Sequence, residues 1–162
     1  MSEAPRHGTW VVLLSLLAGL MLTIWPLPDA AEPFRPEWTA LVLVYWIMAL
    51  PTRFNVGVAW LTGLVVDALT GSLLGQHAMS FTVLAFLTSM VYLRVRVYPV
   101  WQQAFAVMFL LAVHELLLIL IDGSTGNLEG LSWRWAPVVT GTLLWPWVML
   151  LLRYLRRQFQ VS

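Results

Sequence analysis

One acidic residue of this sequence lies inside a long apolar segment, where a charged side chain is unfavourable and so indicates a specific role. Asp67 lies in the segment 56–74, which is mostly apolar or small. Around it a small or acidic residue recurs at every fourth position, and the five positions are Ala59, Gly63, Asp67, Gly71 and Gly75. On a helix, this spacing places all five on one slowly turning face. Because small residues let a second backbone approach closely, we predict that this small-residue face packs against another helix.

Two hypotheses are open for the carboxylate of Asp67. It is either a proton, ion or substrate site, or the acceptor of an interhelical hydrogen bond that fixes packing. An ionised Asp at the centre of a bilayer costs about 2.5–3.5 kcal/mol, so it must face protein or water, be paired, or be protonated. A carrier needs a chain of polar groups, and few are present here. We therefore favour the packing hypothesis, and expect Asp67→Asn to preserve function and Asp67→Leu to abolish it.

A second polar group lies in another apolar segment. His114 and Glu115 are adjacent, and Asp122 follows Glu115 by seven residues, so the two carboxylates share a helical face. A His–Glu pair can ligate a metal or move protons. There is no H-E-x-x-H pattern and no cysteine, so a metal site is poorly supported and we predict a packing or ion-pair role. No Gly-x-Ser-x-Gly or phosphate-binding loop occurs either, and we expect no enzyme activity and no cofactor.

The composition defines the kind of protein that must position these groups. Of 162 residues, 60% are hydrophobic and only 10% are charged, and the mean hydropathy is +0.79. Ordinary soluble domains are about 45–50% apolar and about 25% charged. This difference excludes a soluble globular protein, a disordered chain and a nucleic-acid-binding protein. The sequence predicts an all-α membrane protein with a single membrane domain over residues 1–162.

Six apolar segments are candidates for membrane crossings. A bilayer core needs about 20 apolar residues of helix. The predicted spans are 10–27, 38–50, 56–74, 78–93, 101–121 and 136–153. The second span is short, because 13 residues of helix cover only about 20 Å.

The arginines predict the orientation of these spans. With six crossings, seven of the nine arginines fall on the side that holds both termini, and Arg35 and Arg134 fall on the other. Positive residues are enriched on the cytoplasmic side of membrane proteins. We therefore predict an inner-membrane protein with both termini in the cytoplasm.

Particular motifs resemble those of a known family. They are Arg35-Pro36-Glu37-Trp38, the tripeptide Val44-Tyr45-Trp46, and the pattern G-L-x-x-D-x-x-x-G-x-x-L-G-x-x-A that runs from Gly63 to Ala78. With the length and the basic C-terminal end, they resemble the MreD family, the small integral-membrane rod-shape-determining proteins of bacteria. The specific part of the resemblance lies in residues 35–80.

The resemblance implies a role in building the lateral cell wall. Family members act with MreC, and in a wider complex with MreB, RodZ, RodA and a class B penicillin-binding protein. The family fold is similar to the substrate-binding subunits of ECF-type vitamin transporters, and no catalytic residue is implied. Two hypotheses follow. The chain either binds MreC and regulates peptidoglycan synthesis within the membrane, or is a small-molecule-binding or transporter subunit.

Overall fold

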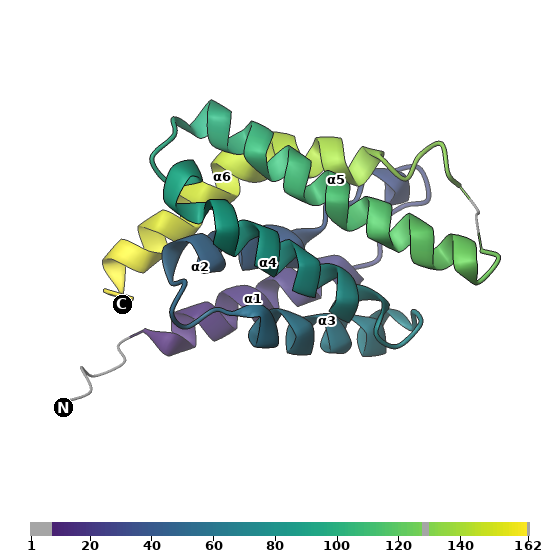
Figure 1. Ribbon diagram of the computed structural model, residues 1–162, viewed down its shortest axis with the longest axis horizontal. Coiled ribbons are helices and arrows are strands. Elements are labelled where there is room, and N and C mark those ends of the chain that lie inside the picture. The colour runs from purple at the N-terminus through teal and green to yellow at the C-terminus, as the bar shows by residue number, and fades with distance from the viewer. Residues whose placement is uncertain (1–7, 128–129, 162) are drawn as a thin grey trace.

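The computed structural model describes residues 8–127 and 130–161, and these form a bundle of six α-helices (Figure 1). No strand occurs within the described ranges, so the prediction of an all-helical chain is confirmed there. The elements in chain order are α1 (Thr9–Ile24), the short 3-10 helix η1 (Glu32–Phe34), α2 (Trp38–Ala49), α3 (Val56–Thr70), α4 (Gln76–Val95), α5 (Val100–Ser124) and α6 (Ala136–Gln158).

The lengths of the helices divide them into two groups. The helices α4, α5 and α6 are long and apolar enough to cross a membrane, whereas α1 and α3 are shorter apolar helices. Helix α1 ends at Ile24, just before two prolines, Pro26 and Pro28, which cannot continue a helix. The predicted third span continued to residue 74, but α3 ends at Thr70 because Gly71 adopts a left-handed conformation with φ 69°. That six helices make six crossings stays a prediction.

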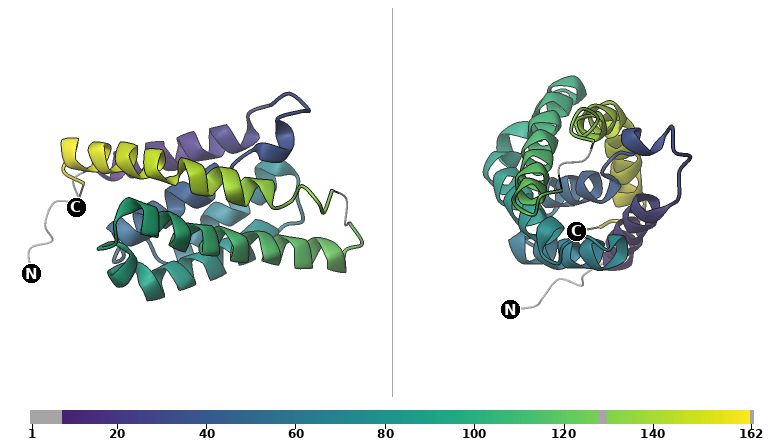
Figure 2. Two further views of the ribbon diagram at one scale, coloured as in Figure 1. Left: turned by 90° about the horizontal axis from the view of Figure 1, so that it is seen from above. Right: turned by 90° about the vertical axis from the view of Figure 1, so that its right-hand side faces the viewer.

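Helix α2 is the core of the bundle. Every residue from Thr39 to Met48 is buried, and α2 packs against α1, α4 and α6. Seen end-on, it lies inside a ring of the other helices (Figure 2). A helix that is apolar on all sides is typical of such an enclosed position. Its 12 residues cover about 18 Å, and because protein rather than lipid surrounds it, its length is not set by the thickness of a bilayer.

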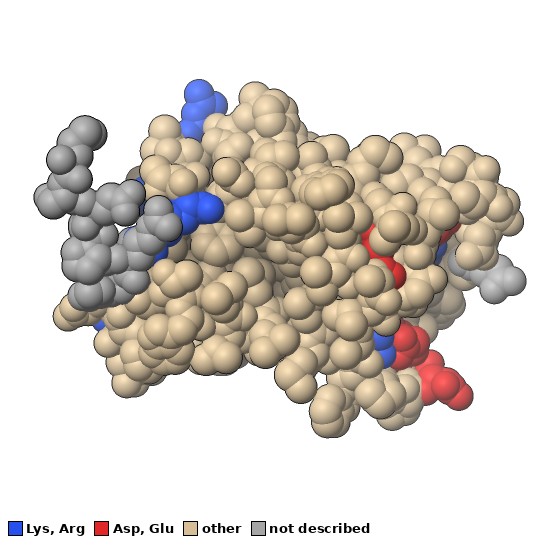
Figure 3. Space-filling view, turned by 90° about the horizontal axis from the view of Figure 1, so that it is seen from below, with Lys and Arg blue, Asp and Glu red and all other residues tan. Residues whose placement is uncertain are grey.

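Opposite charges gather at opposite ends of the bundle (Figure 3). The polar end holds the connections that follow α1, α3 and α5, and the arginine end holds the connections that follow α2 and α4 together with the last turns of α6. The described chain also begins and ends at the arginine end, where the rings of Trp10 and Phe159 are 4.8 Å apart. The described carboxylates lie in or near the polar end, and they are Asp29, Glu32, Glu37, Asp67, Glu115 and Asp122. The arginines of the other end are Arg53, Arg94, Arg96, Arg153, Arg156 and Arg157.

Candidate functional site

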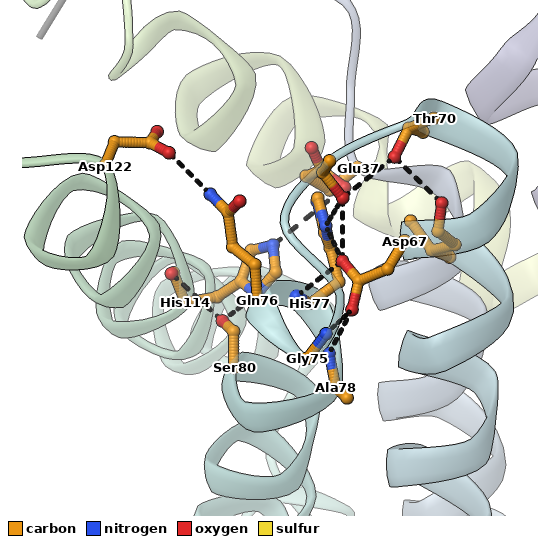
Figure 4. A network of polar contacts seen from close by, with 12 residues as sticks. Glu37, Asp67, Thr70, Gly75, Gln76, His77, Ala78, Ser80, His114 and Asp122 are labelled. Carbon is orange, nitrogen blue, oxygen red and sulfur yellow. Dashed lines mark hydrogen bonds and ion pairs between the residues drawn. The ribbon is translucent and has the colours of Figure 1, made fainter. Parts of the chain in front are cut away.

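Asp67 on α3 caps the N-terminus of the next helix, α4 (Figure 4). The N-cap position of α4 is Gly75, which has no side chain to accept a hydrogen bond. Instead, the Asp67 carboxylate accepts from the backbone N–H of Gly75 at 2.8 Å and of His77 at 2.9 Å, with that of Ala78 at 3.4 Å. The first N–H groups of a helix have no partner inside it, and a negative charge there is favourable. Asp67 therefore does for α4, from a neighbouring helix, what an N-cap side chain does locally.

Two side chains complete the hydrogen bonds of Asp67. The Ser72 hydroxyl donates to Oδ1 at 2.8 Å, and Nδ1 of His77 lies 2.8 Å from the same oxygen. Because an ionised carboxylate only accepts hydrogen bonds, His77 carries its hydrogen on Nδ1 in this arrangement. Asp67 is 1% exposed, and both of its oxygens are satisfied by donors from its own chain.

The small-residue face forms a close contact with α4 at Gly63. A Cβ on Gly63 would lie 2.4 Å from the Cα and 2.5 Å from the backbone nitrogen of Ala78. Ala78 is itself fully buried, as is Ala59 one turn before Gly63. The hairpin of α3 and α4 thus depends on the absence of a side chain at Gly63, where the two backbones meet.

Gly71 and Gly75 lie outside this face, so the prediction of one helical face through residue 75 is wrong at these two positions. Gly71 ends α3 with φ 69°, and Gly75 precedes α4 with φ 99°. A Cβ on either would meet nothing within 4 Å. These glycines provide the left-handed conformations of the turn rather than a close helix contact.

His114 and Glu115 face different partners and do not act as a pair. Nδ1 of His114 lies 2.5 Å from the Ser80 hydroxyl, and its buried Nε2 has no hydrogen bond and lies 3.9 Å from Oε2 of Glu37. Glu115 accepts from Nε of Arg134 at 2.9 Å. Among residues 8–127 and 130–161, no three His, Asp or Glu side chains are placed to hold a metal ion.

Arg134 joins the two carboxylates that the sequence places on one face. Its Nη1 lies 2.5 Å from Oδ2 of Asp122, while its Nε contacts Glu115. The other oxygen of Asp122 accepts from the side-chain amide of Gln76 at 2.7 Å. The sequence did not identify Arg134 as the partner, because the α5–α6 connection that brings it back has no motif.

A cavity of about 1070 Å³ opens between these groups at the polar end. Glu37, His77, Glu115 and Arg134 line it, together with residues of the η1 and α3–α4 connections. Glu37 belongs to the Arg35-Pro36-Glu37-Trp38 motif, but its carboxyl has no hydrogen-bonded partner among the described side chains. Burial raises the pKa of the Glu37 carboxyl above its ordinary value, although His77 and the arginines nearby lower it in part.

Comparisons with known proteins agree with the family resemblance that the sequence motifs indicate. The family model of the rod shape-determining protein MreD matches residues 5–155. The rod shape-determining protein MreD of Haemophilus influenzae is 31% identical over 156 residues, which cover 94% of this chain and 94% of that protein. No solved structure shows significant similarity, so the expected likeness to ECF-type substrate-binding subunits stays a prediction. Both matches extend over nearly the whole chain, and three of the described helices are long and apolar enough to span a membrane. This chain therefore belongs to the MreD family of rod shape-determining proteins.

Proposed function

We propose that this chain is a non-catalytic membrane component of the rod-shape machinery, which binds MreC and helps to maintain rod shape by regulating peptidoglycan synthesis. The observation that carries the proposal is membership of a rod-shape-determining family over almost the full length. As the family resemblance implies, MreC is the direct partner, and RodA, a class B penicillin-binding protein, MreB and RodZ belong to the wider complex. Family membership does not favour the alternative, a small-molecule-binding or transporter subunit.

The polar contacts support a binding role rather than a chemical one. A catalytic carboxylate needs a free lone pair or proton that faces a substrate. Both oxygens of Asp67 accept hydrogen bonds from its own chain, and Glu115 and Asp122 are both bound to Arg134. These three carboxylates hold helices together, whereas Glu37 has no hydrogen-bonded partner among the described side chains. We infer that partner proteins bind the outer surface of the bundle. Such a protein acts by binding one arrangement of its partners more tightly than another.

We also propose six crossings of the bacterial inner membrane, with both termini in the cytoplasm. The separation of arginines from carboxylates supports this orientation, and Gly8 beside Val161 supports an even number of crossings. Helix α2 crosses inside the protein. Reporter fusions at Ser162 and Glu129, two positions outside the described residues, test the orientation. We expect a cytoplasmic reporter to be active at Ser162 and a periplasmic one at Glu129, and the reverse pattern would contradict it.

The functional part of the proposal is tested by depletion and by copurification. Rod-shaped cells depleted of this protein should become round, and re-expression should restore the rods. Affinity-tagged protein should retain co-expressed MreC in mild detergent, whereas a polytopic membrane protein of similar size should not. Depleted cells that keep their rod shape, or a tagged protein that never retains MreC, would contradict the proposal.

A further inference from the structure

A small pocket at the arginine end brings three cationic side chains together. It has a volume of about 130 Å³, and Arg96, Arg153 and Arg156 line it. Arg96 lies in the connection between α4 and α5, while the other two lie on the last turns of α6. Three arginines from two separate segments of the chain therefore line one pocket, although like charges repel.

Buried polar side chains form the inner wall of this pocket. Tyr45 of α2 is 6% exposed and Gln103 of α5 is 4% exposed, and both line it. The enrichment of arginine at a cytoplasmic membrane surface explains positive charge at this end in general. It does not explain why three arginines surround a recess that is lined by buried hydroxyl and amide groups.

The three arginines have no anionic partner in the described part of the chain. The ion pairs of arginine there involve only Arg35 and Arg134, both at the polar end. A guanidinium group binds phosphate and carboxylate groups through paired hydrogen bonds. With no carboxylate at this end of the described chain, the chemistry of the pocket is complementary to an anion.

We propose that this pocket binds the phosphate group of an anionic phospholipid headgroup. Its volume of about 130 Å³ holds several water molecules and therefore has room for a tetrahedral phosphate group. Basic pockets between membrane helices are a recurrent site for such headgroups. The proposal does not depend on MreC binding or on the orientation of the protein.

The surroundings of the pocket assign the phosphate to a lipid. Trp101 and Tyr154 are close in sequence to the pocket residues Gln103 and Arg153. Each is 62% exposed, as is typical of aromatic side chains at the headgroup level. Leu150 and Leu151 on α6 are more than half exposed, one turn farther from the chain end than Tyr154. A lipid whose phosphate enters the pocket can therefore lay its acyl chains along exposed apolar surface.

The test uses the full-length protein in detergent and native mass spectrometry. Phosphatidylglycerol or phosphatidylcholine is titrated, and the dissociation constant of the first bound lipid is measured. We expect a clear preference for phosphatidylglycerol. The triple variant Arg96→Gln, Arg153→Gln, Arg156→Gln should lose it, with affinity for phosphatidylglycerol falling about fivefold for each arginine removed.

A matched triple variant provides the control. Arg53→Gln, Arg94→Gln, Arg157→Gln removes the same charge from the same end but no residue of the pocket, and it should keep the preference. Equal losses in both triples would show general surface charge and overturn the proposal, as would a wild-type protein that does not distinguish the two lipids. In a further arm, inorganic phosphate is added without lipid. Thermal stabilisation by phosphate as large as that by phosphatidylglycerol would overturn the assignment to a lipid.

Discussion

The turn between α3 and α4 and the arginine pocket at the opposite end differ in how their charged groups are paired. At the turn, the single charge of Asp67 is surrounded by donors from its own chain. At the pocket, three positive charges meet without a carboxylate from the described residues. A region whose hydrogen bonds are complete needs no ligand, so changes there should alter stability. A region with unpaired charges should instead show its role when a partner binds.

The largest effect on the complete region is expected from Gly63→Ala. The new Cβ would lie within 2.5 Å of the backbone of Ala78, and backbone cannot move aside as a flexible side chain can. We expect a loss of about 3 kcal/mol in the free energy of unfolding, measured by thermal denaturation in detergent.

Gly141→Ala is the matched control for this substitution. A Cβ there would lie 2.8 Å from Cδ1 of Leu111, the end of a side chain that can change rotamer. Its cost should be about 1 kcal/mol or less. Equal losses at the two glycines would show that the backbone contact between α3 and α4 is not special.

Asp67→Asn is expected to destabilise by about 2–3 kcal/mol, with the loss independent of the lipid present. The sequence alone favours a mild effect, because the amide keeps size and hydrogen-bonding capacity. In the structure the backbone partners of Asp67 are all N–H donors. The NH₂ group of Asn would face the N–H of Gly75 or of His77, so a hydrogen bond that caps α4 would be lost. Thermal denaturation of Asp67→Asn beside Asp67→Leu measures this. If the melting temperature of Asp67→Asn equalled that of the wild type, the structure-based prediction would be wrong and the sequence-based expectation of a mild effect would hold.

Arg134→Gln should have a smaller effect, about 1–2 kcal/mol. It leaves Glu115, whose side chain is 6% exposed, without its cationic partner. The cost is below that of a fully buried ion pair, because the Arg134 side chain is 22% exposed. Arg157→Gln, at an exposed arginine without an ion pair in the described part of the chain, should change the melting temperature little. A double variant with Glu115→Gln should recover part of the loss.

Glu37→Gln should have the smallest effect and the opposite sign. Burial raises the pKa of Glu37, so the folded protein binds its proton more tightly than the unfolded chain does. Stability from this group is therefore lost as pH rises from the ordinary range of glutamate through the raised pKa. Removing the carboxyl should raise the melting temperature slightly at neutral pH and flatten its dependence on pH. Melting curves across the acidic range would show this, and a lower melting temperature would contradict it.

The helices could be predicted because apolar runs and proline positions are local features of the sequence. The end of α3 could not, since the pattern of small residues continues through Gly71 and Gly75 although their backbones leave the helix. Periodicity does not distinguish a glycine that permits packing, such as Gly63, from one that permits a left-handed conformation.

The candidate site was predictable in kind but not in its partners. A hydrogen-bonding role for Asp67 follows from the cost of a charge in an apolar segment, but its main partners are backbone N–H groups, which every residue has. The spacing of Glu115 and Asp122 predicts a shared face, whereas Arg134 reaches them only through the path of the α5–α6 connection. The arginine pocket depends likewise on two distant segments that meet only in the folded chain.

Amide hydrogen exchange tests the capping role of Asp67 most directly. The backbone N–H groups of Gly75, His77 and Ala78 should be protected in the wild-type protein, because each points to the Asp67 carboxylate. In Asp67→Asn they should exchange about tenfold faster or more, whereas the amides in the middle of α5 should keep their wild-type rates. Unchanged protection of these three amides in a folded Asp67→Asn variant would contradict the conclusion that Asp67 holds the α3–α4 hairpin together.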